Sequence, residues 1–215
     1  MMQVKIFVNN PWGENTILLY DETLETAVID CGCLKESEQQ RVSDFISSNG
    51  LKPVRLLNTH LHVDHVFGNQ FMVDTYGLKP EASEEDDFLI AKSCDLEKMY
   101  GMKAMRGVKH PPATAHYLQD GDTVKFGNST LKVIAIPGHS PGGLCYYSEP
   151  DKLLISGDVL FNGAIGRSDL PRGDGAALIR NIREKLFVLP DDVVVIPGHG
   201  DTTTIGDEKL YNPFF

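Results

Sequence analysis

The sequence contains no apolar run long enough to span a lipid bilayer, and its basic residues are outnumbered by acidic ones. Twenty lysines and arginines against thirty acidic residues give a formal net charge of −10, which repels a polyphosphate backbone. Residues 1–10 carry one lysine and only a short apolar run, so no secretory signal is expected. We therefore expect no membrane or nucleic-acid partner, and we predict a cytoplasmic protein.

Cysteine is also scarce, and Cys31, Cys33, Cys94 and Cys145 form no CxxC pair. Their spacing does not indicate a disulfide framework, so reduced and mostly buried thiols are expected. A redox or metal role is conceivable for Cys31 and Cys33, which flank a glycine, but turn and core thiols explain the pair as well. We assign the cysteines no function.

The composition is that of a globular protein, with 41% hydrophobic and 23% charged residues. Its 215 residues fit a single domain spanning residues 1–215. Short apolar and β-branched runs bounded by turn residues predict strands in 4–8, 16–20, 26–30, 53–57, 152–158 and 193–200, and a hairpin over 120–139.

Helices are predicted where apolar residues recur every three or four positions. Residues 36–50 carry a capping box at Ser37 and Gln40. A second helix begins at Ser83, and its acidic residues, Asp86 among them, are expected to face solvent. Residues 174–189 form a third, amphipathic helix. The methionine-rich stretch 99–112 is interpreted either as an adaptable lid or as a loop packed on the core.

Four of the predicted buried strands are followed directly by a metal-ligating residue: His60, His139, Asp158 and His199. The segments "VIAIPGHS" and "VVVIPGHG" repeat the same order, in which proline ends a strand and glycine allows a tight turn before the histidine. Ligand sites of layered α/β folds form beyond the carboxyl ends of strands, so these residues are expected to meet.

The stretch "HLHVDH" adds His62, Asp64 and His65 to this set. In an extended segment His60 and His62 point the same way, and a helix starting near Asp64 would direct Asp64 and His65 to a neighbouring ion. Seven ligands, one of them bridging, suit two divalent metal ions better than one. Zinc is our first choice of metal, with iron and manganese as alternatives.

Each piece of this pattern also has a simpler explanation. A lone "PGH" is a common turn, and Asp64 could merely cap the following helix. His110 and His116 lack a comparable setting and are interpreted as ordinary surface or packing residues. A metal-binding domain without catalysis remains an alternative, but it requires a blocked site.

A serine hydrolase is a rival interpretation of the same residues. Gly138 to Gly142 match G-x-S-x-G, and Ser140, Asp158 and His199 follow in the chain order of a triad. However, the serine of such an elbow lies between a strand and a helix, whereas the residues after Ser140 predict a turn and a strand. This interpretation also leaves "HLHVDH" unexplained.

Several motifs resemble those of the metallo-β-lactamase-fold hydrolases, in particular the glyoxalase II-like group. These motifs are "THLHVDH", "PGHSPGG", "SGDVLF", "GRSDL" and the closing "IPGHGDTTTIGDE" with "NPF". The resemblance runs nearly end to end and implies an α/β (α+β) fold, a four-layer αββα sandwich with a metal site at one edge. It also implies that His60, His62 and His139 bind one metal, that Asp64, His65 and His199 bind the other, and that Asp158 bridges them.

The same resemblance implies a metal-dependent hydrolase that acts on a small-molecule acyl-thioester such as S-lactoylglutathione. Metal coordination lowers the pKa of water to near 7, so a bridging hydroxide would be the nucleophile. Asp64 and Asp158 are the expected catalytic carboxylates, with Asp64 orienting the nucleophile. The bridging aspartate counts against a true β-lactamase.

Two departures limit the resemblance. Longer glyoxalase II enzymes carry a C-terminal helical domain, which we do not expect here because the sequence stops at "YNPFF" soon after His199. Lys103, Arg106, Lys109, Arg167 and Arg172 could receive an anionic substrate, but surface basic residues usually only solubilise. Persulfide dioxygenases of the same fold, which use one iron, resemble the chain in the first-site ligands and the "GRSD" segment, and they remain the alternative function.

Overall fold

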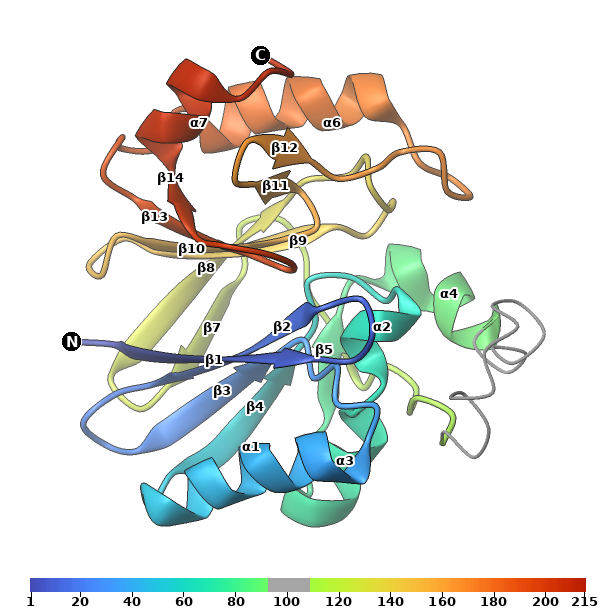
Figure 1. Ribbon diagram of the computed structural model, residues 1–215, viewed down its shortest axis with the longest axis vertical. Helices are drawn as coiled ribbons and strands as arrows, with labels where there is room; N and C mark the ends of the chain where they lie inside the picture. Colours follow the sequence, from blue (N-terminus) through green and yellow to red (C-terminus); the bar gives the residue numbers. More distant parts are fainter. Residues whose placement is uncertain (93–108) are drawn as a thin grey trace.

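Two β-sheets face each other, and helices cover the outer side of each (Figure 1). The computed structural model describes residues 1–92 and 109–215. Helices α1 (Glu36–Ser48) and α3 (Asn69–Tyr76) lie on one side, and α6 (Gly175–Asn181) and α7 (Ile205–Tyr211) on the other. This arrangement confirms the predicted four-layer αββα sandwich.

The first sheet is antiparallel over its first three strands and parallel from the third onward. Its strands, in spatial order, are β1 (Gln3–Asn9), β2 (Glu14–Tyr20), β3 (Glu25–Ile29), β4 (Lys52–Leu57), β5 (Pro80–Ala82) and β6 (His116–Tyr117).

The second sheet contains one parallel pair, β10 with β13, among antiparallel neighbours. Its spatial order is β14 (Thr203–Thr204), β13 (Val194–Pro197), β10 (Leu153–Gly157), β9 (Leu144–Ser148), β8 (Ser129–Ala135) and β7 (Thr123–Phe126). A small hairpin, β11 (Leu160–Phe161) with β12 (Ala164–Ile165), follows β10.

Strand alternation explains why both faces of each sheet are apolar. In β2, Ile17 and Leu19 point into the core between the sheets, whereas Leu18 faces the helix side and packs in a cluster with Val42 of α1. Burial on both faces gives the near-continuous apolar runs seen in the sequence. The core therefore holds the sheets at a fixed spacing, and the ends of their strands form a rigid platform.

Most predicted elements are present, and Ser83 is a cap as expected, but the cap of the first helix differs. Helix α1 is capped at Lys35 and not through Ser37 and Gln40, because the carboxylate of Glu38 accepts hydrogen bonds from the N–H groups of Leu34 and Lys35. Ser83 caps a 3₁₀ turn (Glu84–Asp86) that runs into α4 (Asp87–Lys92). The expectation that Asp86 faces solvent is wrong, since its side chain is fully buried.

The other elements agree with the expectations or fall partly outside the described range. The hairpin turns at Gly127 and Asn128 as predicted, and the helix expected over 174–189 is α6 followed by a π-helical turn (Ile182–Leu186). Of the methionine-rich stretch 99–112, residues 99–108 lie outside the described residues. No helix among the described residues is long and apolar enough to cross a membrane.

Candidate metal centre

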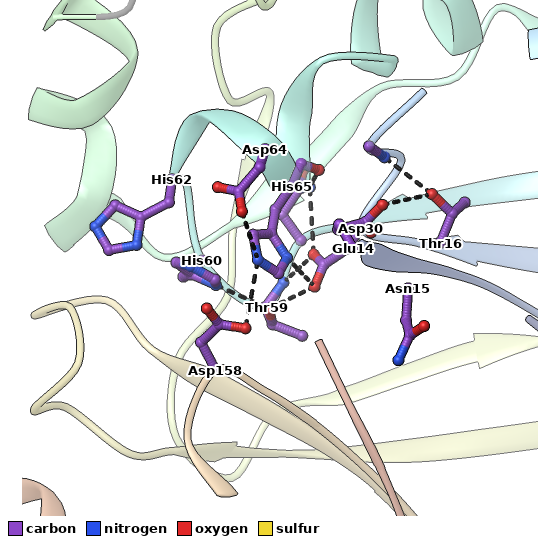
Figure 2. A network of polar contacts seen from close by, with 12 residues as sticks. Glu14, Asn15, Thr16, Asp30, Thr59, His60, His62, Asp64, His65 and Asp158 are labelled. Atoms are coloured by element: carbon purple, nitrogen blue, oxygen red, sulfur yellow. Dashed lines mark hydrogen bonds and ion pairs between the residues drawn. The ribbon is translucent and has the colours of Figure 1, made fainter. Parts of the chain in front are cut away.

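Strand ends from both sheets bring the predicted ligands together at one end of the sandwich. His60 follows β4 in the first sheet, and the chain then forms α2 (Val63–Val66), which carries Asp64 and His65. From the second sheet, His139 follows β8, Asp158 follows β10 and His199 follows β13. Figure 2 shows His60, His62, Asp64, His65 and Asp158 gathered at this end.

The first group consists of His60, His62 and His139, which we call the histidine trio. One ring nitrogen of each lies within 4.8 Å of the others. The closest approach is between Nδ1 of His62 and Nε2 of His139, at 2.9 Å. His60 and His139 are buried and His62 is partly exposed, so the trio can be reached from one side.

The second group consists of Asp64, His65 and His199, which we call the mixed trio. Its ligand atoms also lie within 4.8 Å of one another. Nε2 of His199 is 3.3 Å from Oδ2 of Asp64, and Nε2 of His65 is 3.8 Å from the same oxygen. One carboxylate and two imidazoles thus converge next to the histidine trio.

Asp158 lies between the two trios. Its Oδ2 is 3.6 Å from Nε2 of His139 and 3.7 Å from Nε2 of His199, while its Oδ1 is 3.4 Å from Nε2 of His65. A carboxylate with both oxygens directed at imidazole nitrogens of two neighbouring groups has the position of a bridging ligand.

Four of the five imidazoles are oriented through Nδ1, which leaves Nε2 directed inward. The Nδ1 of His139 lies 2.7 Å from the carbonyl of Arg167, and that of His199 lies 3.1 Å from the carbonyl of Trp12. The Nδ1 of His65 faces Asp30 Oδ2 at 3.0 Å. The Nδ1 of His60 lies 3.1 Å from the hydroxyl oxygen of Thr59.

These partners fix the protonation of the rings. Carbonyl and carboxylate oxygens only accept, so Nδ1 of His139, His199 and His65 must carry a hydrogen. The Thr59 hydroxyl donates its own hydrogen to Asp30, so it accepts from Nδ1 of His60. In each neutral ring Nε2 is then left as the lone-pair donor. This pattern, in which one ring nitrogen is anchored to protein and the other is free, is typical of metal-ligating histidines.

The electrostatics of the two trios differ. Burial lowers the pKa of His60 well below its usual value, and burial together with His139 lowers the pKa of His62 to about 4. The histidine trio therefore contains at least two imidazoles that are neutral at pH 7, which is the form that binds metal.

In the mixed trio the carboxylates dominate. Burial opposes the charge on His65, but nearby carboxylates, Asp158 first, raise the pKa of His65 well above its usual value. Burial likewise opposes ionisation of Asp158, yet the charge of His65, followed by those of His199 and His139, holds the pKa of Asp158 well below its usual range. The negative charge at this end of the sandwich thus attracts cations, whether protons or metal ions.

Unpartnered atoms point to the same conclusion about the donor set. Among the described residues, His60 Nε2, His65 Nε2 and Asp158 Oδ1 are buried side-chain atoms without a hydrogen bond. Buried polar atoms without a partner are costly and call for an explanation. A divalent cation in each trio would satisfy all three atoms, so the residues fit such ions.

A hollow of about 460 Å³ opens onto the trios and gives access to them. Its lining includes His139, Asp158 and His199, together with Phe161 of β11 and Arg167. A small substrate can therefore reach the inward-facing ligand atoms from solvent.

Sequence reasoning missed three polar residues that hold the ligands in place. Asp30, directly after β3, accepts hydrogen bonds from the backbone and hydroxyl of Thr59 and contacts His65. The rule that strands end at functional residues would have found Asp30 if applied to β3. Asn15 and Asp86 carry no such signal, because their partners are far away in the sequence.

Ser140 does not have the setting of a nucleophile. It lies in a turn between β8 and β9 and is followed by a strand where an elbow requires a helix. Its hydroxyl is buried and donates to Asp86 Oδ2 at 2.8 Å. The serine-hydrolase alternative therefore has no support in this geometry.

The other described residues considered from the sequence are members of neither trio, although Arg167 lines the hollow beside His139. His110 and His116 are exposed and belong to neither trio. Lys109 pairs with Asp74, Arg167 pairs with Asp169, and Arg172 stacks on Phe88, whereas Lys103 and Arg106 lie outside the described residues.

The cysteines were expected to be buried thiols. Cys31, Cys33 and Cys145 are free and buried, and Cys94 lies outside the described residues.

Comparison with known proteins matches residues 9–199 to the profile of the metallo-beta-lactamase superfamily. The chain belongs to this superfamily. The family resemblance deduced from the motifs is thereby confirmed. A curated relative, hydroxyacylglutathione hydrolase GloC of Haemophilus influenzae, is 34% identical over 214 residues, which cover 99% of this chain and 98% of the relative.

Two solved metallo-beta-lactamase-fold structures are similar over nearly their whole length. The B3 metallo-beta-lactamase BLEG-1 has a TM-score of 0.89 at 30% identity and covers 99% of each chain. TTHA1623, solved in a di-iron-bound form, has a TM-score of 0.86 at 32% identity and covers 98% of this chain and 100% of its own. The chain thus belongs to a superfamily of metallohydrolases. Its convergent histidines and aspartates form groups suitable for a divalent metal.

Proposed function

We propose that this metallo-beta-lactamase superfamily protein is a dinuclear metal-dependent hydrolase of acyl-thioesters, with S-lactoylglutathione or a similar glutathione thioester as substrate. The observation that carries the proposal is the position of Asp158 between two complete trios, with its oxygens directed at His139, His199 and His65. A single-metal site would not need the second trio.

The proposed ligands are those expected from the sequence. His60, His62 and His139 hold one ion, Asp64, His65 and His199 hold the other, and Asp158 bridges them. The His62 ring would bind through Nδ1, which faces His139, and the other four rings through Nε2. Zinc suits this set of nitrogen and oxygen ligands, and the di-iron form of TTHA1623 makes iron the main alternative.

Divalent ions bound here would lower the pKa of water and polarise a substrate carbonyl. The protein's own part is to orient and to handle a proton. The carboxylate of Asp64, which is 18% exposed, faces both the two histidines of the mixed trio and solvent. It can therefore orient the attacking water and accept its proton.

One comparison and one chemical argument support a thioester as the substrate. The relative GloC, whose name gives hydroxyacylglutathione as its substrate, aligns with this chain from end to end at 34% identity. In addition, a thiolate leaves without prior protonation, so the site needs no separate acid on the leaving-group side.

Metal analysis by mass spectrometry, on protein purified without chelators, tests the proposal together with a substrate panel. We expect two divalent ions per chain and release of thiol from S-lactoylglutathione. Oxygen consumption on glutathione persulfide with one iron per chain would instead support the dioxygenase alternative. Because BLEG-1 is a B3 metallo-beta-lactamase, a β-lactam belongs in the panel, and preferential β-lactam hydrolysis would overturn the thioester assignment.

A further inference from the structure

Asp86 is a buried carboxylate within an acidic run. Its neighbours Glu84 and Glu85 are exposed, whereas the Asp86 side chain has no exposed surface. Burying a carboxylate is unfavourable unless hydrogen bonds compensate it. Its partners therefore indicate why it is buried.

Three donors from two different loops converge on this carboxylate. Oδ2 accepts from the backbone N–H of Leu61 at 3.2 Å and from the hydroxyl of Ser140 at 2.8 Å. Oδ1 accepts from the backbone N–H of Gly142 at 2.7 Å. The carboxylate thus links a loop of the first sheet to a loop of the second.

These two loops are the ones that carry the histidine trio. Leu61 lies between His60 and His62, and Ser140 directly follows His139. None of the three donors adjoins His65 or His199 in the sequence. The donors to Asp86 therefore adjoin members of the histidine trio and none of the mixed trio.

The loop after His139 is shaped around the Asp86 side chain. A Cβ atom at Gly142 would lie 2.6 Å from Cγ of Asp86, so only glycine allows this close approach. The loop also closes on itself, since Ile136 N–H donates to the carbonyl of Gly143 at 2.8 Å. Removing the carboxylate should therefore loosen the distance between the loops without unfolding either of them.

We propose that Asp86 is a positioning residue that sets the distance between the two loops of the histidine trio and thereby the affinity of this trio for a divalent ion. It acts through Leu61, Ser140 and Gly142 and does not contact the ion. The inference rests on the proposed metal site, but it is independent of the substrate.

The structure offers a counterpart for the mixed trio, which serves as a comparison. Asn15 of β2 is buried, and its Nδ2 donates to the carbonyls of Pro197 and Gly200 at 3.0 and 2.9 Å, on either side of His199. It also offers a matched control in Asp21, another buried carboxylate with several donors, which binds the β7–β8 turn and touches neither trio.

The experiment titrates Zn²⁺ into metal-free protein in competition with a chromophoric chelator, and repeats the titration with Co²⁺ to record its absorption spectrum. We expect Asp86→Asn to lower the affinity for one of the two ions about 10–100-fold, which is the range usual for residues that orient metal ligands. The affinity for the other ion should be unchanged. Asp21→Asn should change the affinity for neither ion. Asn15→Ala should lower the affinity for the ion whose binding is unaffected by Asp86→Asn.

A double substitution assigns the effect to a trio. His62→Ala removes a ligand of the histidine trio, so adding Asp86→Asn to it should cause no further loss of affinity for the remaining ion. If Asp86→Asn does not fold, Ser140→Ala is the alternative variant, because it deletes one of the three hydrogen bonds to Asp86. It should lower the affinity for the same ion to a smaller extent and alter the Co²⁺ spectrum.

The outcomes separate this inference from the proposed function. Wild-type protein that binds no divalent ion would overturn the proposed function and the role of Asp86 with it. Wild-type binding of two ions, with Asp86→Asn or Ser140→Ala indistinguishable from it, would overturn the role of Asp86 alone. An equal loss at both ions would do the same.

Discussion

Nδ1 of His65 lies 3.0 Å from Oδ2 of Asp30, and neither side chain exposes more than 1% of its surface. Asp30 also accepts from the backbone N–H and the hydroxyl of Thr59, at 2.7 and 2.6 Å. One buried carboxylate therefore joins the end of β3 to the start of the ligand-bearing loop. The contact between Asp30 and His65 determines which nitrogen of His65 faces the other members of the mixed trio.

Asp30→Asn should disturb this arrangement because an amide has only one accepting oxygen, whereas four donors face the Asp30 carboxylate, Asn58 Nδ2 at 3.4 Å being the fourth. We expect the affinity for one divalent ion to fall about 10–100-fold. We also expect the free energy of unfolding to fall by about 1–3 kcal/mol, since a buried donor is left without an acceptor. Chelator competition and urea unfolding measure the two effects. Asp44→Asn, an exposed carboxylate on α1, should change neither quantity.

Replacing a proposed ligand should remove metal without unfolding the protein. His62→Ala and Asp158→Ala each delete one ligand at a partly exposed position, so the apolar core between the sheets is untouched. We expect both variants to lose bound metal and thioesterase activity while keeping the circular dichroism of the wild type. His116→Ala, which alters an exposed histidine of β6, is the control. Full metal content in either ligand variant would contradict the assignment.

The sequence allowed much of the fold and the candidate ligands to be predicted because both rest on local patterns. Apolar runs bounded by turns marked the strands, and proline and glycine marked the points at which β8 and β13 end. His139 and His199 follow those points directly. Strand ends gather at the edges of sheets, so positions along the chain were enough to predict a shared site.

What could not be predicted depends on contacts between distant residues. Asp86 belongs to an acidic run and was interpreted as solvent-facing, but its donors Ser140 and Gly142 lie 54 and 56 positions further along the chain. Asn15 is likewise separated from Pro197 by 182 positions. Only the packing of one sheet on the other brings such groups together, and no periodicity in the sequence records it.

The stability of the end remote from the metal centre should depend on pH through Asp21. Burial raises the pKa of this carboxyl, but hydrogen bonds, first from Thr23 and then from Ser129 and Asn128, outweigh burial and lower it to about 2. The ordinary pKa of an aspartate, which applies in the unfolded chain, is 3.8. Because the pKa in the folded protein is lower, the contribution of ionised Asp21 to stability is fully present above about pH 4 and is lost as the pH falls towards 2.

Asp21→Asn should therefore destabilise the protein at pH 6, and its difference from the wild type should shrink between pH 4 and pH 2. Urea unfolding midpoints at pH 6, 4 and 3 measure this difference. If the difference stays constant over the whole range, the ionised carboxylate is not the source of the stabilisation.

Gly198 occupies a position at which any side chain would displace two proposed ligands. A Cβ atom there would overlap Oδ1 of Asp158 and would lie 2.7 Å from Cε1 of His65. The backbone at Gly198 is not left-handed, so the cost of Gly198→Ala comes from crowding, which we expect to lower the free energy of unfolding by about 1–3 kcal/mol. Because Asp158 and His65 must both move, bound metal should be lost from a chain that still folds.

The control is Gly206→Ala, which makes the same change in α7. There the new Cβ would lie 3.0 Å from Cβ and from the carbonyl oxygen of Asp191, and metal content should be unchanged. Equal metal content in the two variants would show that the glycine of this "PGH" turn does not make room for the ligands, and that the turn serves only to end β13.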